Sequence, residues 1–228
     1  MPHTNQAGKS FVREAAILSA ANFVIKLIGV VYKIPLSRWL GDGMGIFTAA
    51  YSIYAMLFMI STSGLPVAVS RLVAASAERG RALEVKKVFK LTLVAFGIIG
   101  VFFSTLLFAL AEPIAVWSKH PESALAMRVI APTLLFICIS AAFRGYFQGL
   151  RNMYPTAISQ FIEAFCRMAL GLGSTAWAQY MGYSPAVQAA FAISGVTVGV
   201  FLGMAFVVLY KRFSKRRYVR ATDTRSAR

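Results

Sequence analysis

Residues 144–163 read R-G-Y-F-Q-G-L-R-N-M-Y-P-T-A-I-S-Q-F-I-E, and this stretch decides the fold. It joins two hydrophobic segments through a short turn with glycines, aromatic residues and arginines, and then carries Glu163 into the next apolar segment. Gly145 and Gly149 are expected to let the backbone turn tightly. Pro155 is expected to open a helix, because a missing amide hydrogen costs nothing in the first turn. The stretch therefore predicts a helix that brings a carboxylate into an apolar region.

The helix after this turn is predicted to carry its polar residues on one face. At about 100° per residue they form a single stripe, and the opposite face is apolar. The stripe consists of Thr156, Gln160, Glu163, Arg167 and Ser174. Glu163 and Arg167 stand four residues apart with the acid first, which is the better order for an ion pair within a helix. Two interpretations stay open: a structural pair, or a Glu163 carboxylate that exchanges between Arg167 and Lys26, or takes up a proton or cation, as the protein moves.

The composition is typical of a polytopic membrane protein. The 228 residues are 58% hydrophobic and 14% charged, with a mean hydropathy of +0.65, whereas soluble domains are about 25% charged. The predicted fold is all-α: a six-helix transmembrane bundle over residues 1–210, followed by a basic tail over residues 211–228. The first and fifth spans are the weakest because they carry charges. The six predicted spans are residues 12–34, 45–63, 88–111, 125–143, 155–179 and 186–210.

The distribution of basic residues predicts the orientation. Of the 24 lysines and arginines, eighteen fall on the side of the two termini, four on the other side and two within spans. The positive-inside rule therefore places both termini in the cytoplasm. Because loops and tail account for the net charge of +16, the expected partners are anionic membrane lipids and not nucleic acid. Residues 67–87 are predicted to form a cytoplasmic amphipathic helix or helical hairpin, and residues 220–228 to be disordered.

Lys26 lies near the middle of the first span, where a lysine that faces lipid costs about 3 kcal/mol to insert. Asn22, Lys26, Gly29 and Lys33 share one helical face. In one interpretation this face lines a water-filled cavity that binds an anionic headgroup such as a pyrophosphate. In the other, Lys33 reaches the outer interface and Lys26 pairs with a buried acid.

Other motifs predict packing and not chemistry. Gly195, Gly199 and Gly203 form two overlapping G-x-x-x-G steps, which predict close helix packing within one chain or between chains. The two cysteines form no C-x-x-C pair and the two histidines are isolated, so neither a metal site nor a cofactor is expected. The scattered acids do not form the clustered set that a membrane enzyme needs. Arg144, Tyr146 and Arg151 are expected to hold the turn through helix carbonyls or to meet lipid phosphates.

The motif R-G-Y-F-Q-G, followed by M-x-P-T-A-x-S-Q-x-x-E, resembles the SpoVB/MurJ-like branch of the multidrug/oligosaccharidyl-lipid/polysaccharide exporter superfamily, as do residues 25–41 and 61–73. The resemblance runs through all six segments in order. Members of that branch have two lobes, and this chain resembles the N-terminal lobe only. A second lobe is therefore expected, from a homodimer partner, a separate chain or, as we favour, a longer chain of which this is a truncated half.

The resemblance implies a flippase or exporter of a lipid-linked anionic glycan precursor. It implies action in cell-envelope or spore-cortex synthesis at the bacterial plasma membrane, and no enzymatic activity. The alternatives are a multidrug or cation antiporter of the related branch, which would need an acidic cavity, and a non-transporting membrane subunit. The candidate substrate- or cavity-binding residues are Asn22, Lys26, Lys33, Gln160, Glu163 and Arg167, and the candidate motif residues are Arg144, Gly145, Gln148, Gly149 and Pro155.

Overall fold

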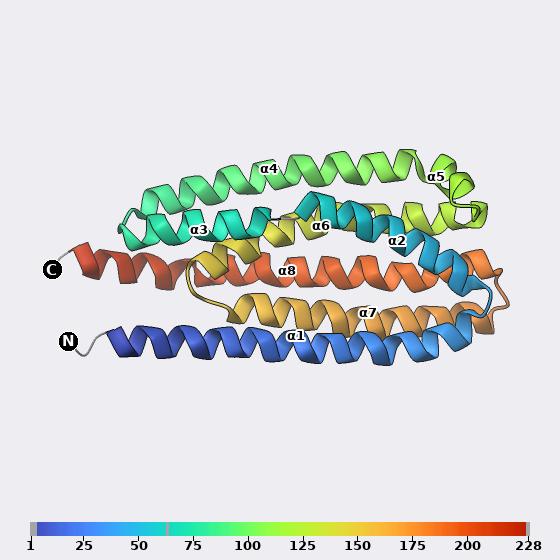
Figure 1. Ribbon diagram of the computed structural model, residues 1–228, viewed down its shortest axis with the longest axis horizontal. Coiled ribbons are helices and arrows are strands. Elements are labelled where there is room, and N and C mark those ends of the chain that lie inside the picture. The colour runs from blue at the N-terminus through green and yellow to red at the C-terminus, as the bar shows by residue number, and fades with distance from the viewer. Residues whose placement is uncertain (1–3, 63, 227–228) are drawn as a thin grey trace.

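The protein is a bundle of helices that run lengthwise beside one another (Figure 1). The computed structural model describes the backbone of residues 4–62 and 64–226, and the side-chain surroundings of residues 19–60, 64 and 66–214. Every regular element within those ranges is a helix, which confirms the all-α prediction. The elements are α1 (Thr4–Leu40), α2 (Gly43–Thr62), α3 (Leu65–Glu78), α4 (Ala82–Ala109), α5 (Ala111–Trp117), the short 3₁₀ helix η1 (Pro121–Ser123), α6 (Ala124–Gly149), α7 (Tyr154–Tyr180) and α8 (Pro185–Ser226).

Five helical stretches in the described residues are long and apolar enough to cross a membrane, which confirms a polytopic membrane protein. They are Ser19–Leu40, Gly43–Ile60, Ala82–Ala109, Pro121–Gly149 and Pro185–Ser214. The remaining predicted span, residues 155–179, forms α7 but is not among the five. Its charges and hydroxyl groups lower its hydropathy, although α7 has 27 residues and lies lengthwise beside α1 and α8 (Figure 1).

The two ends of the bundle differ in chemistry. Both chain termini, the α3–α4 turn and the α6–α7 turn lie at one end, here called the basic end (Figure 1). Its turns carry exposed Arg79, Arg81 and Arg151. The other end, here called the tryptophan end, carries all three tryptophans, which are exposed near the last residues of α1, α5 and α7: Trp39, Trp117 and Trp177. Exposed tryptophans at helix ends are typical of a membrane–water interface.

Gly145 and Gly149 serve helix packing and not the turn, which corrects the sequence-based expectation. Both lie inside α6 and are buried against α3. A Cβ on Gly149 would lie 2.6 Å from the Ser70 carbonyl oxygen, and a Cβ on Gly145 would lie 3.0 Å from the Pro66 carbonyl oxygen. The turn itself is made one residue beyond the helix cap, where Arg151 has a φ of 56°.

The segment predicted as an amphipathic helix, residues 67–87, contains α3 and the start of α4. Helix α3 continues the direction of α2 and packs along α6 and α4 (Figure 1). Gly64, with a φ of 74°, precedes α3 at this break. At the far end of α3, Arg151 Nη2 donates a hydrogen bond to Glu78 Oε1 at 2.7 Å. This ion pair connects the α6–α7 turn to α3.

The α7–α8 pair is the most extensive helix contact in the bundle. A Cβ on Gly195 would lie 2.4 Å from the Cα of Gly171, so the two backbones touch at this crossing. Gly199 and Gly203 continue the contact against the backbone of α7 near Arg167 and Ser159. The G-x-x-x-G steps therefore pack within the chain.

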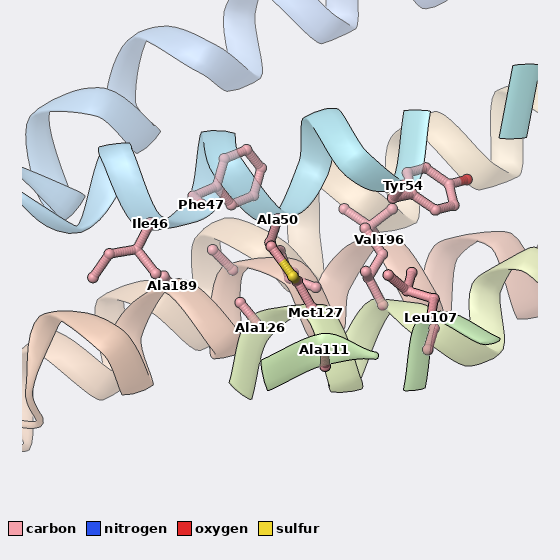
Figure 2. Close-up of a cluster of buried hydrophobic side chains, with 14 of the residues drawn as sticks. Ile46, Phe47, Ala50, Tyr54, Leu107, Ala111, Ala126, Met127, Ala189 and Val196 are labelled. Carbon is pink, nitrogen blue, oxygen red and sulfur yellow. The ribbon is translucent and has the colours of Figure 1, made fainter. Parts of the chain in front are cut away.

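The largest apolar core lies toward the tryptophan end. Figure 2 shows Ile46, Ala50 and Tyr54 of α2 lying over side chains of α6 and α8. Met127 and Val196 are fully buried there. Small residues such as Ala126 and Ala189 let these helices approach closely, since dispersion contacts supply the attraction where lipid and protein are equally apolar.

Helix α8 runs through position 210 without a break and continues to Ser226. Residues 220–226, expected to be disordered, therefore belong to this helix. The division into a bundle and a tail at residue 210 stays a prediction. The side chains of Lys9 and Arg13 and those of the basic tail from residue 215 onward lie outside the described residues.

Candidate anion-binding site

The polar stripe of α7 faces the interior of the bundle and its apolar side faces outward. Thr156 and Glu163 are buried, whereas Phe161 and Phe165 are exposed. This arrangement reverses that of a helix in a water-soluble protein, and it is what a bilayer requires, because lipid cannot satisfy polar groups. Pro155 stands in the first turn of α7, as its sequence position predicts.

Glu163 joins two arginines from different helices. Its Oε1 accepts a hydrogen bond from Arg167 Nη2 at 2.8 Å, and its Oε2 accepts one from Arg144 Nη2 of α6, also at 2.8 Å. The side chains of Glu163, Arg144 and Arg167 are only 10%, 13% and 27% exposed. We call these three residues the ionic cluster. Because the ionic cluster contains one carboxylate and two guanidinium groups, the formal charge of the ionic cluster is +1.

The glycines of α8 allow the ionic cluster to lie so deep. A Cβ on Gly203 would lie 3.3 Å from Glu163 Cβ, and a Cβ on Gly199 would lie 3.0 Å from the backbone nitrogen of Arg167. Larger residues at these two positions would push α7 away from α8. The small-residue motif and the charged motif are therefore parts of one arrangement.

Sequence reasoning found the Glu163–Arg167 pair but not the part played by Arg144. The sequence pattern predicts that Arg144 holds the turn, yet Arg144 lies within α6 and donates a hydrogen bond to Glu163 of α7. This partner could have been found from the hairpin itself. Two antiparallel helices joined at residues 150–153 place residues a few turns before and after the connection side by side.

Three tyrosines that the sequence analysis did not single out lie close enough to Arg167 to affect it electrostatically. Tyr32 of α1 and Tyr51 and Tyr54 of α2 interact electrostatically with its guanidinium group. Tyr54 is buried within the core, and the Tyr32 ring packs against Gly171. Arg167 therefore lies on the side of α7 that packs against α1.

The face of α1 that carries Asn22, Lys26 and Lys33 is exposed on the surface of the bundle. A Cβ on Gly29, in the middle of this face, would meet nothing within 4 Å. Among the described residues, Lys26 makes no ion pair with Glu163, which is occupied by its two arginines. Whether this face borders a cavity stays a prediction.

Lys26 and Arg167 lie at nearly the same depth. Helices α1 and α7 both run from the basic end to the tryptophan end, and Tyr32 meets Gly171 where they pack (Figure 1). Lys26 precedes Tyr32 by six residues and Arg167 precedes Gly171 by four, or about 9 and 6 Å along the helix axes. The two cations therefore share one level near the middle of the spans.

Two further predicted residues, Gln148 and Gln160, lie on the same two helices as the ionic cluster. Gln160, one turn before Glu163, is half-buried, and its Oε1 has no hydrogen-bond partner in the structure. Gln148 is half-buried near the end of α6. The structure thus brings Arg144, Glu163 and Arg167 into contact and places the α1 lysines on a separate, exposed face.

Comparison with known proteins shows the family of the chain. The family model described as polysaccharide biosynthesis protein matches residues 11–226. The chain belongs to this family. No solved structure matches it significantly.

Curated relatives from Bacillus subtilis (strain 168) are similar to this chain over most of its length. The chain is 28% identical to stage V sporulation protein B over 216 residues, 30% identical to the uncharacterized membrane protein YabM over 203, and 27% identical to the lipid II flippase MurJ over 217. These matches cover 94%, 89% and 90% of this chain but 41%, 37% and 40% of the relatives. The chain therefore spans about two fifths of their length, and the resemblance to the SpoVB/MurJ-like branch is confirmed as a distant relationship covering one lobe.

Proposed function

We propose that this chain is one lobe of a transporter that moves a lipid-linked anionic glycan precursor across the bacterial plasma membrane, and that it is not an enzyme. The observation that carries the proposal is an excess of cations at mid-membrane depth. Lys26 and Arg167 share that level, Arg144 reaches toward it, and Glu163 pairs with the two arginines but not with Lys26. Such charges are costly in lipid and mark a path for a charged substrate.

The sign of the charge distinguishes the substrate classes. A transporter of organic cations would need an acidic cavity, but here the carboxylate of Glu163 is neutralised by two arginines. A phosphate or pyrophosphate group matches lysine and arginine donors in both charge and hydrogen bonding. A lipid-linked precursor supplies that group, and the name of the relative MurJ points to the same substrate class.

In this proposal α7 is a sixth membrane span, and both termini are cytoplasmic. The basic end would then face the cytoplasm and the tryptophan end the outside, as the positive-inside rule requires. With an even number of spans, a second lobe inserts in the same orientation, so the exposed face of α1 would border a chamber shared by two lobes. Lys26 would meet the substrate there, and Asn22 and Lys33 would extend the same wall.

Transport in proteoliposomes tests the proposal. The purified chain is reconstituted with a fluorescent undecaprenyl-diphosphate glycan, and movement between leaflets is followed by quenching from outside. We expect Lys26→Ala to slow movement at least about tenfold, as losing one charge-assisted contact to a diphosphate would. Lys87→Ala removes an exposed lysine at the basic end of α4 and serves as the matched control. Equal, measurable rates for wild type and Lys26→Ala would refute the role of Lys26, no movement with either protein would mean that the second lobe is required, and chemical alteration of the lipid would indicate an enzyme.

A further inference from the structure

Helices α6 and α7 carry most of the unsatisfied polar atoms in the described part of the protein. Six buried side-chain atoms in the described residues have no hydrogen-bond partner, and all but the Tyr32 hydroxyl belong to these two helices. Buried polar groups are nearly always hydrogen-bonded, so their concentration in one place needs an explanation. The five atoms are Ser140 Oγ, Arg144 Nε, Thr156 Oγ1, Gln160 Oε1 and Arg167 Nε.

Helical spacing directs these groups toward the ionic cluster. Ser140 is one turn before Arg144 on the side of α6 that reaches Glu163, while Thr156 and Gln160 share the face of Glu163 on α7. Ser140 and Thr156 are fully buried. α6 and α7 contact each other little elsewhere, since each packs mainly on α8 or other neighbours. The unsatisfied atoms thus lie on the facing sides of the two helices, spread over about three turns of α7 from Thr156 to Arg167.

The chemistry of these groups favours an anion. The two guanidinium Nε–H groups are donors only, and the two hydroxyls donate readily, which leaves the Gln160 oxygen as the one obligatory acceptor of the five. Each arginine gives Glu163 a single hydrogen bond in place of the two-point contact that guanidinium groups usually make with carboxylates. Both arginines therefore keep unused donors.

Charge balance separates an anion from ordered water. Water molecules would satisfy the free donors, but they would leave the formal charge of +1 on the ionic cluster. An isolated charge in a low-dielectric interior is strongly unfavourable unless it is paired. One monovalent anion bound at the two arginine Nε–H groups would balance that charge and satisfy those two donors.

We propose that the contact between α6 and α7 binds one small monovalent inorganic anion of the halide class, held by Arg144 and Arg167 beside Glu163. The single excess charge sets the valence, because a divalent anion would leave a net negative charge beside the carboxylate. The tight approach of α8 through Gly199 and Gly203 favours a small ion. This site is separate from the α1 lysines, so it does not depend on the proposed transport function.

Thermal unfolding of the purified chain in nanodiscs tests the proposal. The unfolding midpoint is measured in sodium chloride and in sodium gluconate at equal ionic strength. Because a ligand stabilises the state that binds it, chloride is expected to raise the wild-type midpoint by about 5 °C. Arg144→Gln makes the ionic cluster neutral and should abolish the difference, whereas Glu163→Gln raises its charge to +2 and should enlarge it.

Arg128→Gln is the matched control, because it removes an arginine of an exposed ion pair with Glu112. It should respond to chloride as the wild type does. A chloride response that persists in Arg144→Gln, an equal response to gluconate, or a stronger response to sulfate would overturn the assignment. Crystals grown in bromide give a readout that needs no variant: anomalous scattering should place bromide beside Arg144 and Arg167, and its absence there would also overturn it.

Discussion

Helices are held together by different interactions at the tryptophan end of the bundle and between α6 and α7. Near the tryptophan end, Met127, Leu134 and Ile193 fill a dry core between close-packed helices. Between α6 and α7, contact depends on the ionic cluster and includes unsatisfied polar atoms. The first region needs only good packing in order to be stable, whereas the second retains charges at a cost. The difference indicates that packing stabilises the tryptophan end, whereas buried charge pairs join α6 to α7.

The largest expected effect is on the backbone contact that supports both regions. Gly195→Ala would place a methyl group 2.4 Å from Gly171 Cα, so α7 and α8 must separate and the folded chain should be lost from detergent extracts. Gly173→Ala is the matched control on α7, since its new methyl would meet nothing within 4 Å. Size-exclusion chromatography after mild heating measures how much folded protein remains for each variant. Comparable monodisperse peaks for the two variants would contradict the close α7–α8 crossing.

The next effect separates buried from exposed ion pairs. In chloride-free buffer, Glu163→Gln leaves two buried guanidinium groups unpaired and should destabilise the protein by about 3 kcal/mol. Glu112→Gln removes the acid of an exposed pair with Arg128 and should cost less than about 1 kcal/mol. Unfolding midpoints in nanodiscs compare the two. Similar losses would mean that the ionic cluster is no more important for stability than a surface pair.

A smaller effect is expected in the dry core. Leu134→Ala removes a fully buried side chain of α6 and should cost about 2 kcal/mol through lost contacts and the cavity left behind. Leu91→Ala on α4 changes a side chain that is 71% exposed and should cost almost nothing. Unfolding midpoints in nanodiscs compare the two variants. A larger loss of stability for Leu91→Ala than for Leu134→Ala would show that this face of α4 packs on a partner.

The smallest effect concerns the contact between α3 and α6. Gly149→Ala places a methyl group 2.6 Å from the Ser70 carbonyl oxygen and should destabilise by about 1–2 kcal/mol, because α3 must shift. A Cβ on Gly97 in α4 would meet nothing within 4 Å. Gly97→Ala should therefore be neutral or slightly stabilising, since alanine favours the helix. If Gly149→Ala is neutral by the same measurement, α3 does not pack along α6 as described.

Hydropathy and helical spacing predicted most of the fold. The spans around α2, α4, α6 and α8 follow from long apolar runs, and the buried stripe of α7 follows from its spacing. Hydropathy alone could not place α7, because the residues that make it less apolar are the ones it buries. The long-range partners escaped prediction for a related reason. Periodicity shows which face of a helix Arg144, Gly145 or Tyr54 occupies, but not which helix that face meets.

Binding of a lipid-linked diphosphate to the purified chain tests the central claim most directly, because it requires only this lobe. Titration of an undecaprenyl-diphosphate glycan into nanodiscs containing the wild type, Lys26→Ala and Lys87→Ala would be followed by native mass spectrometry. The account predicts saturable binding that Lys26→Ala weakens at least about tenfold while Lys87→Ala leaves it unchanged. Equal affinity for all three proteins would contradict the proposal that the mid-membrane cations recognise an anionic substrate.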